Sequence, residues 1–345
     1  MKPQKTVLRY AGGKSRAIKK ITPFVEPYDT IVSPFIGGGS LEVHWASKGK
    51  KVIGSDIFGL LINFWDVLLE SPEALAKELK KIEPTASAYK IIKEMLMCTS
   101  EVQEMLSHRK SDFYKREQVS IPAVKLAAYY YFNHNCSYGP GFLGWPSKIY
   151  MNQEKWNKTI EKIRTFSCPN LQVAHREFET AIKESGSAFL YLDPPYYLQP
   201  DDDNKMLGGI YPMKNIPVHH NNFDHEKLRD LLLSHKGDFV LSYNNCETIR
   251  EWYSDFELFF PEWHYSMDVG EVRIGSNRMQ RVGDEQTEAA NTLRKEIESV
   301  EEKLKKMKTK ELKVELAALK TAKHDIMKKE SHELLIVKRK KGCDQ

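Results

Sequence analysis

Residues 188–196 read Ala-Phe-Leu-Tyr-Leu-Asp-Pro-Pro-Tyr, a short apolar run that stops at an aspartate and two prolines. Continuous apolar runs of this length are typical of strands buried on both faces of a parallel sheet. Proline has no backbone N–H to donate to a neighbouring strand, so we expect the strand to end there. Ligands bind at the carboxyl ends of strands in open α/β folds. The run therefore predicts an α/β fold with Asp193, Pro194, Pro195 and Tyr196 at its functional edge.

The residues that follow this strand suit a planar amine attached to an aromatic ring. The Asp193 carboxylate and the Pro194 carbonyl can accept its two N–H bonds, and the Tyr196 ring can stack on its face. The alternative is a strand followed by a proline turn that has no chemical role.

A second motif stands earlier in the chain. Residues 30–33 (Thr-Ile-Val-Ser) are typical of a short strand, and residues 34–40 (Pro-Phe-Ile-Gly-Gly-Gly-Ser) lead from it into a helix expected over residues 41–48. Strand, glycine loop and helix in this order form the usual cradle of a cofactor. Consecutive glycines let the backbone approach a ligand closely. Glu42 stands where G-x-G-x-x-G has its last glycine, so we do not expect a dinucleotide.

Asp56 strengthens the cofactor interpretation. It ends the strand predicted at residues 51–55, about 20 residues after the glycines, where an acidic side chain can bind two ribose hydroxyls. The glycine loop alone could be a tight turn. Together with Asp56 it predicts a site for a nucleoside cofactor.

The amino-terminal residues 9–15 (Arg-Tyr-Ala-Gly-Gly-Lys-Ser) resemble a P-loop only superficially, because Leu8 stands where that motif requires a glycine. We expect a glycine turn that opens a helix over about residues 15–24, with Tyr10 and Lys14 facing its start. Such a turn can hold a carboxylate. The alternative is a helix cap with a surface lysine.

In one chain order, the motifs at residues 10–14, 34–40 and 193–196, with Asp56 among them, resemble the DNA adenine methylase family. These are amino-methyltransferases that use S-adenosylmethionine. The resemblance covers about residues 7–280 and resumes at the last strand.

The resemblance implies a Rossmann-like methyltransferase sheet and S-adenosylmethionine as cofactor. It points to Glu177 and Phe178 as contacts to the adenine of the donor, where the family usually has Asp-Phe. It assigns the target amine to Asp193 and the residues that follow it. The other residues that would hold the donor are Tyr10, Lys14, Phe35, Gly37, Gly38, Gly39, Ser40, Asp56 and Asp193.

The region 59–165 is predicted to be mainly helical and to recognise DNA. Its basic residues are interleaved with aromatic ones, which suits phosphate contacts, as at Lys115 and Arg116. In the segment 129–146, asparagine side chains can pair with adenine edges and a ring can wedge into a base stack. By resemblance this segment corresponds to the loop that probes DNA. Solvated helices and a purely structural loop are the alternatives. The loop residues singled out are Asn133, Asn135 and Tyr138.

Composition limits the remaining possibilities. A chain of 345 residues with net charge +5 is long enough for a catalytic domain and a smaller one, and its charge is compatible with a polyanion. Five scattered cysteines without C-x-x-C favour reduced thiols, and hence the cytoplasm of a cell or of a phage or viral host. We expect no signal peptide and no membrane span. The polar loop 197–221 is expected to be a lid, and its Asp and His residues fit no standard metal site.

The segment between Gly283 and Gly342 contains neither glycine nor proline. Apolar residues spaced alternately four and three apart, beginning at Leu293, predict a coiled-coil seam. Residues 333–338 resemble a last sheet strand, so the chain must return, and we expect an antiparallel helical hairpin that turns near residues 307–311. It could touch DNA, join two subunits as a homodimer or only decorate the surface, and the last two are favoured.

The sequence thus predicts a donor site and an amine site at one edge of the sheet. The resemblance implies methylation of the N6 amine of adenine in double-stranded DNA, with the base extruded into the pocket. Cytosine N4 or RNA as target, an inactive DNA-binding relative and a scaffold remain alternatives. The expected parts are 1–58 (donor site), 59–165 (target recognition), 166–282 (Asp-Pro-Pro-Tyr site), 283–331 (hairpin) and 332–345 (last strand and tail).

Overall fold

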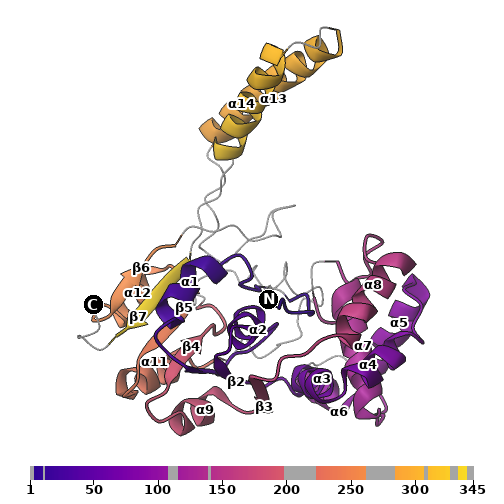
Figure 1. Ribbon diagram of the computed structural model, residues 1–345, viewed down its shortest axis with the longest axis vertical. Helices are drawn as coiled ribbons and strands as arrows, with labels where there is room; N and C mark the ends of the chain where they lie inside the picture. The colour runs from indigo at the N-terminus through magenta and orange to yellow at the C-terminus, as the bar shows by residue number, and fades with distance from the viewer. Residues whose placement is uncertain are drawn as a thin grey trace.

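The computed structural model describes residues 4–10, 12–107, 116–138, 141–197, 223–261, 284–306, 310–326 and 333–339. Within these residues the chain forms a mixed α/β fold on one seven-stranded sheet of order β3-β2-β1-β4-β5-β7-β6 (Figure 1). The strands are β1 (Thr30–Ser33), β2 (Lys51–Asp56), β3 (Leu171–His175), β4 (Phe189–Leu192), β5 (Phe239–Asn244), β6 (Glu257–Phe259) and β7 (Glu333–Lys338).

Strands β1 to β5 pair in parallel, and β7 runs antiparallel to both β5 and β6. Parallel strands end at the same edge of a sheet. The glycine loop after β1, Asp56 at the end of β2 and Asp193 after β4 therefore share one edge, as the sequence predicts.

Strand β4 is buried on both faces, which confirms the prediction from its apolar run. Its side chains alternate between two hydrophobic cores: Tyr191 joins one with Ile21 and Trp45, and Leu192 joins the other with Leu228. Helices thus cover both faces of the sheet. They are α1 (Ile18–Val25), α2 (Ser40–Ser47), α9 (Phe178–Glu184), α11 (His225–Ser234) and α12 (Glu247–Trp252).

A group of helices lies beside the β3 end of the sheet (Figure 1). It packs around α7, whose buried rings include Tyr130, Tyr131 and Phe132. Its core is continuous with the first sheet core. Side-chain caps at Thr85 and Asn152 start two of these helices. The helices are α3 (Gly59–Glu70), α4 (Pro72–Leu79), α5 (Ala86–Met97), α6 (Ser100–Ser107), α7 (Ala123–Cys136) and α8 (Gln153–Arg164).

Two further helices, α13 (Asp284–Lys306) and α14 (Lys310–Ile326), pack against each other (Figure 1). Ile297 and Val300 of α13 are buried, and Lys320 of α14 pairs with Glu301 of α13 at 2.7 Å. The two helices therefore lie side by side, and their expected antiparallel direction stays a prediction. No helix in the described ranges has both the length and the apolar composition needed to cross a bilayer.

Some expectations differ from the structure. The first helix begins at Ile18 rather than near residue 15, because residues 14–17 form a turn in which the Ala17 amide donates to the Lys14 carbonyl. Strand β6 was not predicted, since three residues carry no readable alternation. Residues 263–267 (Trp-His-Tyr-Ser-Met), whose sequence also favours a strand, lie outside the described residues. So do residues 198–221 of the lid expected at 197–221.

Candidate active site

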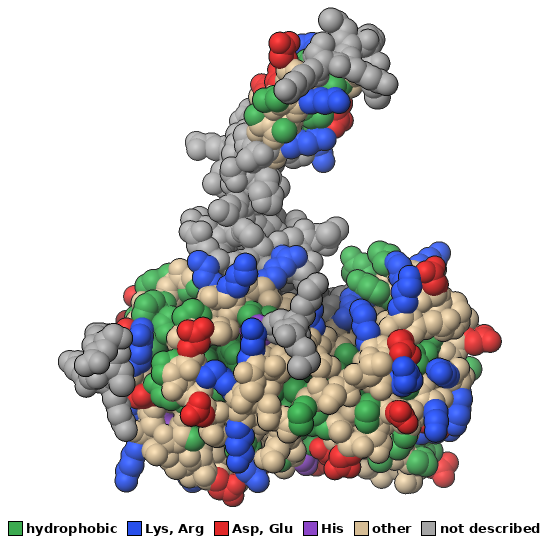
Figure 2. Space-filling view, in the orientation of Figure 1, with side chains coloured by type: hydrophobic (Ala, Val, Ile, Leu, Met, Phe, Trp, Pro, Cys, Tyr) green, Lys and Arg blue, Asp and Glu red, His purple; other side chains and the backbone are tan. Residues whose placement is uncertain are grey.

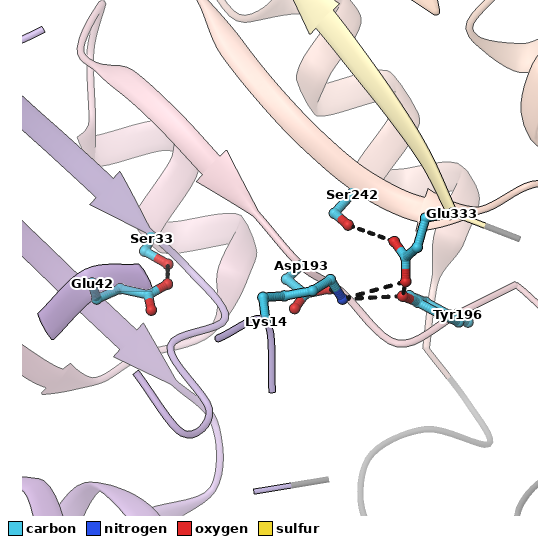
Figure 3. A network of polar contacts seen from close by, with 7 residues as sticks. All are labelled: Lys14, Ser33, Glu42, Asp193, Tyr196, Ser242 and Glu333. Atoms are coloured by element: carbon cyan, nitrogen blue, oxygen red, sulfur yellow. Dashed lines mark hydrogen bonds and ion pairs between the residues drawn. The ribbon is translucent and has the colours of Figure 1, made fainter. Parts of the chain in front are cut away.

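The centre of the site is the carboxylate that follows β4. Asp193 Oδ1 lies 2.7 Å from the Nζ of Lys14, which the amino-terminal turn brings to the end of the strand (Figure 3). Lys14, expected at the donor site, therefore contacts the Asp-Pro-Pro-Tyr motif. Its role toward a methyl donor stays a prediction.

Tyr196 joins the same network. Its hydroxyl accepts a hydrogen bond from Lys14 Nζ at 3.0 Å and donates to Oε1 of Glu333, the first residue of β7. The other oxygen of Glu333 accepts from Ser242 Oγ of β5 at 2.8 Å (Figure 3). Four separate segments thus converge on one cluster, and they fix where the tyrosine hydroxyl lies.

The cluster is buried on one side and open on the other. The side chains of Lys14 and Glu333 are 4% and 2% exposed, whereas that of Asp193 is 22% exposed. Burial raises the pKa of Asp193, and the Lys14 ammonium opposes that rise. Burial, together with the Asp193 charge, raises the pKa of Glu333 to about 8 despite the opposing effect of Lys14. Asp193 is therefore the more accessible of the two carboxyl groups in the cluster, and the one that a substrate can reach.

A third carboxyl group lies nearby in the first turn of α2. Glu42 is buried, and its Oε1 accepts a hydrogen bond from Ser33 Oγ at 2.8 Å (Figure 3). Burial raises its pKa to about 7, with a smaller contribution from the charge of Asp193. The residue that distinguishes the loop from a dinucleotide motif thus adds a titratable group to this edge of the sheet.

The glycine loop is shaped by close contacts. Gly37 and Gly39 have φ values of +46° and +61°, which favour glycine. A Cβ on Gly38 would lie 2.4 Å from the Cβ of Tyr10, so that tyrosine lies directly on the loop. Trp65 Nε1 donates to the Gly37 carbonyl at 3.0 Å. Tyr10 and the glycines are therefore brought together as predicted.

Asp56 holds the loop from the neighbouring strand. Its Oδ2 accepts from the Gly37 amide and its Oδ1 from the Phe58 amide, each at 3.1 Å. Burial raises its pKa, and these backbone bonds oppose the rise. A carboxylate has about four acceptor positions, so capacity for further donors remains.

Three aromatic rings stand beside the loop. Phe35 stacks on Phe178 with ring centroids 5.7 Å apart, and Phe223 meets Phe35 and Phe178 at 5.6 and 5.0 Å. Glu177, next to Phe178, is exposed at the start of α9. The structure thus brings Phe35 and Phe178 together, and Ser40 follows the loop as the first residue of α2.

The expected DNA-binding residues lie in different environments. Asn133 Oδ1 accepts from the Leu143 amide at 2.7 Å, and Asn135 Nδ2 donates to the Tyr131 carbonyl at 3.0 Å. Both asparagines are buried, so neither can reach a base as it lies here. Their role in base recognition stays a prediction that this conformation does not support.

The other three residues differ among themselves. Tyr138 is 63% exposed. Arg116 pairs with Glu94 of α5 at 3.3 Å, and Lys115 lies outside the described residues. Figure 2 shows basic side chains mixed with acidic ones over the helices beside β3, with a group of hydrophobic side chains at their upper end.

His134 connects this region to Tyr10, which lies on the glycine loop. Its ring stacks on Tyr10 with centroids 5.6 Å apart and on Phe142 at 5.7 Å. Burial lowers its pKa to about 3, so it is neutral. Arg9 adds a second link, because its Nη1 donates to the Asn135 carbonyl at 2.7 Å.

Sequence reasoning missed four contributors: Glu333, Ser242, Glu42 and Phe223. One signal was available for Glu333, because a charged residue directly before a run of apolar strand residues must be either exposed or paired. Ser242 and Phe223 carry no such signal in the sequence. Among the described residues, no group of three or more His, Cys, Asp or Glu side chains is arranged to hold a metal ion.

Comparisons with known proteins agree with the motifs. A family model described as D12 class N6 adenine-specific DNA methyltransferase matches residues 10–267. A DNA adenine methylase from Vibrio cholerae serotype O1 is 24% identical over 204 residues, which cover 57% of this chain and 66% of the relative. One from Serratia marcescens is 21% identical over 282 residues, 75% of this chain and 90% of the relative. The chain thus spans just under two thirds of the length of the Vibrio relative.

Proposed function

The chain belongs to the D12 class N6 adenine-specific DNA methyltransferase family, and on that premise we propose that it transfers a methyl group from S-adenosylmethionine to the N6 amine of adenine in double-stranded DNA. One observation carries the proposal. The partly exposed Asp193 carboxylate and the loop at Gly37–Gly39 follow neighbouring parallel strands and therefore lie at the same sheet edge.

The residues around the glycine loop fit the donor. Side-chain atoms are absent at Gly37–Gly39, and Asp56 keeps acceptor capacity for ribose hydroxyls. Tyr10, Phe35, Ser40 and Phe178 would complete the walls, with Glu177 at the rim. When bound, S-adenosylmethionine supplies a methyl group that is already activated by its positive sulfur.

At the other half of the site, Asp193 and the Pro194 carbonyl would accept the two N–H bonds of the target amine. Pro195 ends the strand, and the Tyr196 ring would stack on the base, with its hydroxyl held by Lys14 and Glu333. Holding the amine in one orientation supplies much of the rate. As the nitrogen forms its bond to the methyl carbon, the bond from that carbon to the donor sulfur would break, S-adenosylhomocysteine would leave, and the one proton that the nitrogen loses would be accepted by Asp193.

The DNA side of the proposal is coarser. The region 59–165 would recognise the duplex, and the target base would leave the stack to reach Asp193. Tyr138 and Arg116 are its described candidates for contact, with Lys115. The helices α13 and α14 would form a C-terminal insertion at 283–331 that joins two subunits or decorates the surface.

The test uses the full chain with plasmid DNA and labelled donor, followed by nucleoside analysis of the product. We expect N6-methyladenine, and we expect Asp193→Ala to be at least ~1000-fold slower while donor affinity stays within a few-fold. Asp230→Ala, at an exposed site on α11, is the matched control. N4-methylcytosine as product would favour the cytosine alternative. No transfer by a folded protein would favour an inactive DNA-binding relative.

A further inference from the structure

Glu333 lies outside the part of the chain that matches the family model, yet its carboxyl group contacts the Tyr196 hydroxyl in the candidate active site. It is the first residue of β7, the antiparallel strand next to β5. Its carboxyl group contacts the Tyr196 hydroxyl through Oε1 and the Ser242 hydroxyl through Oε2 (Figure 3). Its Oε1 also lies 3.6 Å from the Nζ of Lys14. The carboxyl group at the start of β7 therefore contacts Tyr196, Ser242 and Lys14 together.

The charges in this cluster do not balance if every group is ionised. Lys14 brings one positive charge to two carboxyl groups, Asp193 and Glu333, in a largely buried space. If both carboxyl groups were ionised, one of the two negative charges would exceed the positive charge that the described residues bring to the cluster, and an excess charge away from water is costly. Adding one proton to the cluster removes that cost.

The distances decide which group takes the proton. Lys14 Nζ is 2.7 Å from Asp193 Oδ1 and 3.6 Å from Glu333 Oε1, so the ammonium stabilises the ionised form of Asp193 more strongly. Glu333 is also the more buried of the two. The proton has a place on Oε2, because the Ser242 hydroxyl 2.8 Å away can accept as well as donate.

We infer that Glu333 is a positioning residue of the proposed methyl-transfer site: in its protonated form it holds the Tyr196 hydroxyl and leaves the Lys14 ammonium to Asp193. The inference rests on the proposed function and assigns Glu333 a task there. It touches no substrate and acts through Tyr196 and Lys14. Glu333 keeps Asp193 as the ionised carboxylate that receives the target amine.

The electrostatics agree with this geometry. Burial raises the pKa of Glu333 to about 8, Asp193 adds to the rise, and Lys14 opposes it. Among the residues that the structure describes, the titratable groups that face Glu333 and its partners are Lys14, Asp193, Tyr196, Tyr191 and, on the Asp193 side, Glu42. Above about pH 8, ionised Glu333 would compete with Asp193 for the ammonium group of Lys14.

The first test is the pH profile of the single-turnover methylation rate. We expect the wild-type rate to fall above pH 8 by about tenfold per unit, and Glu333→Gln, which cannot ionise, to lack that fall while staying within a few-fold of wild type near pH 7. Glu333→Ala should be slower at every pH with unchanged DNA affinity, because it removes one of the two contacts that hold the Tyr196 hydroxyl and leaves only that from Lys14. Glu257→Gln, on the exposed part of β6, is the matched control and should keep the wild-type profile.

A second test does not depend on activity. The folded-state pKa of Glu333 lies above its unfolded value of about 4.3, so the folded state binds the extra proton and stability falls as pH rises from about 4.5 to 8. Glu333→Gln lacks this contribution. The unfolding free energy of Glu333→Gln minus that of the wild type should therefore increase as the pH rises from about 4.5 to 8. A difference in unfolding free energy between Glu333→Gln and the wild type that does not change with pH would overturn the inference. Identical pH–rate profiles for an active wild type and Glu333→Gln would overturn it as well. An inactive wild type would instead overturn the proposed function, while the stability comparison would still decide whether Glu333 is protonated.

Discussion

The end of β4 and the end of α7 both gather polar side chains, but these side chains bond over different distances along the chain. After β4, the Asp193 carboxylate pairs with Lys14, 179 residues away in sequence. At the end of α7, Asn135 bonds to a carbonyl four residues away and Asn133 to an amide ten residues away. The first arrangement joins separate elements, and the second shapes one loop.

This difference teaches how polar residues are used in the two regions. Burying two charged groups from separate elements costs the desolvation of both, and their attraction must offset that cost. Such a contact is therefore expected where a site needs the two groups in one place. A buried amide that satisfies nearby backbone is needed wherever a loop turns inward, whether or not it binds anything. The cluster at β4 is therefore the stronger functional candidate, and four substitutions can break or sharpen the distinction.

The largest effect is expected for Lys14→Met. The substitution leaves the carboxyl groups of Asp193 and Glu333 without their ammonium, and removing one partner of a buried pair costs ~3 kcal/mol of unfolding free energy. The loss should be greater at pH 9 than at pH 6, because the carboxyl groups whose pKa values are raised can take up protons at the lower pH. Urea unfolding at the two pH values measures it.

The matched control is Lys158→Met, which removes an exposed ion pair with Glu154 on α8. That substitution should change stability by less than ~0.5 kcal/mol at either pH. If Lys14→Met behaved like Lys158→Met, the cluster after β4 would be no more than a surface arrangement, and the contrast with α7 would disappear.

The sheet edge was predictable from sequence because strand ends are constrained. The apolar run before Asp193 predicts a buried strand, and parallel pairing then brings its end beside the Gly37–Gly39 loop. Neither step requires knowledge of side-chain packing. Residue type and position along a strand together fix the location of the group.

Glu333 could not be assigned in the same way. Its role depends on β7 pairing with β5, which brings it beside Ser242, and no periodicity in the sequence states which strands pair. For Asn133 the residue type leaves two roles open. An asparagine at a helix end suits a DNA base and a backbone amide equally well, and only the position of Leu143 decides between them.

A middle-sized effect is expected when Asn133 and Tyr138 are compared. Asn133→Ala removes a buried acceptor from the Leu143 amide and should lower the unfolding free energy by ~1–3 kcal/mol. Tyr138→Ala, at an exposed ring, should leave stability unchanged and weaken DNA binding by ~1–3 kcal/mol if the ring stacks on a base. Thermal unfolding and fluorescence anisotropy with labelled duplex separate the two outcomes. If Asn133→Ala instead lost DNA affinity with no change in unfolding free energy, the result would support the predicted contact of Asn133 with a base.

The smallest effect is expected for Arg116→Ala. Arg116 pairs with Glu94 at 3.3 Å at an exposed site, so its removal should change stability by less than ~0.5 kcal/mol. If it contacts a phosphate, the slope of log affinity against log salt should fall in magnitude by about 1, equally for specific and non-specific duplexes. Arg164→Ala, whose side chain pairs with Glu161 on α8, is the matched control for a surface arginine. An unchanged slope in Arg116→Ala would mean that its pairing with Glu94 is structural, as the bonds of the α7 asparagines are, and Tyr138 would then be the described residue of the predicted set still available for DNA contact.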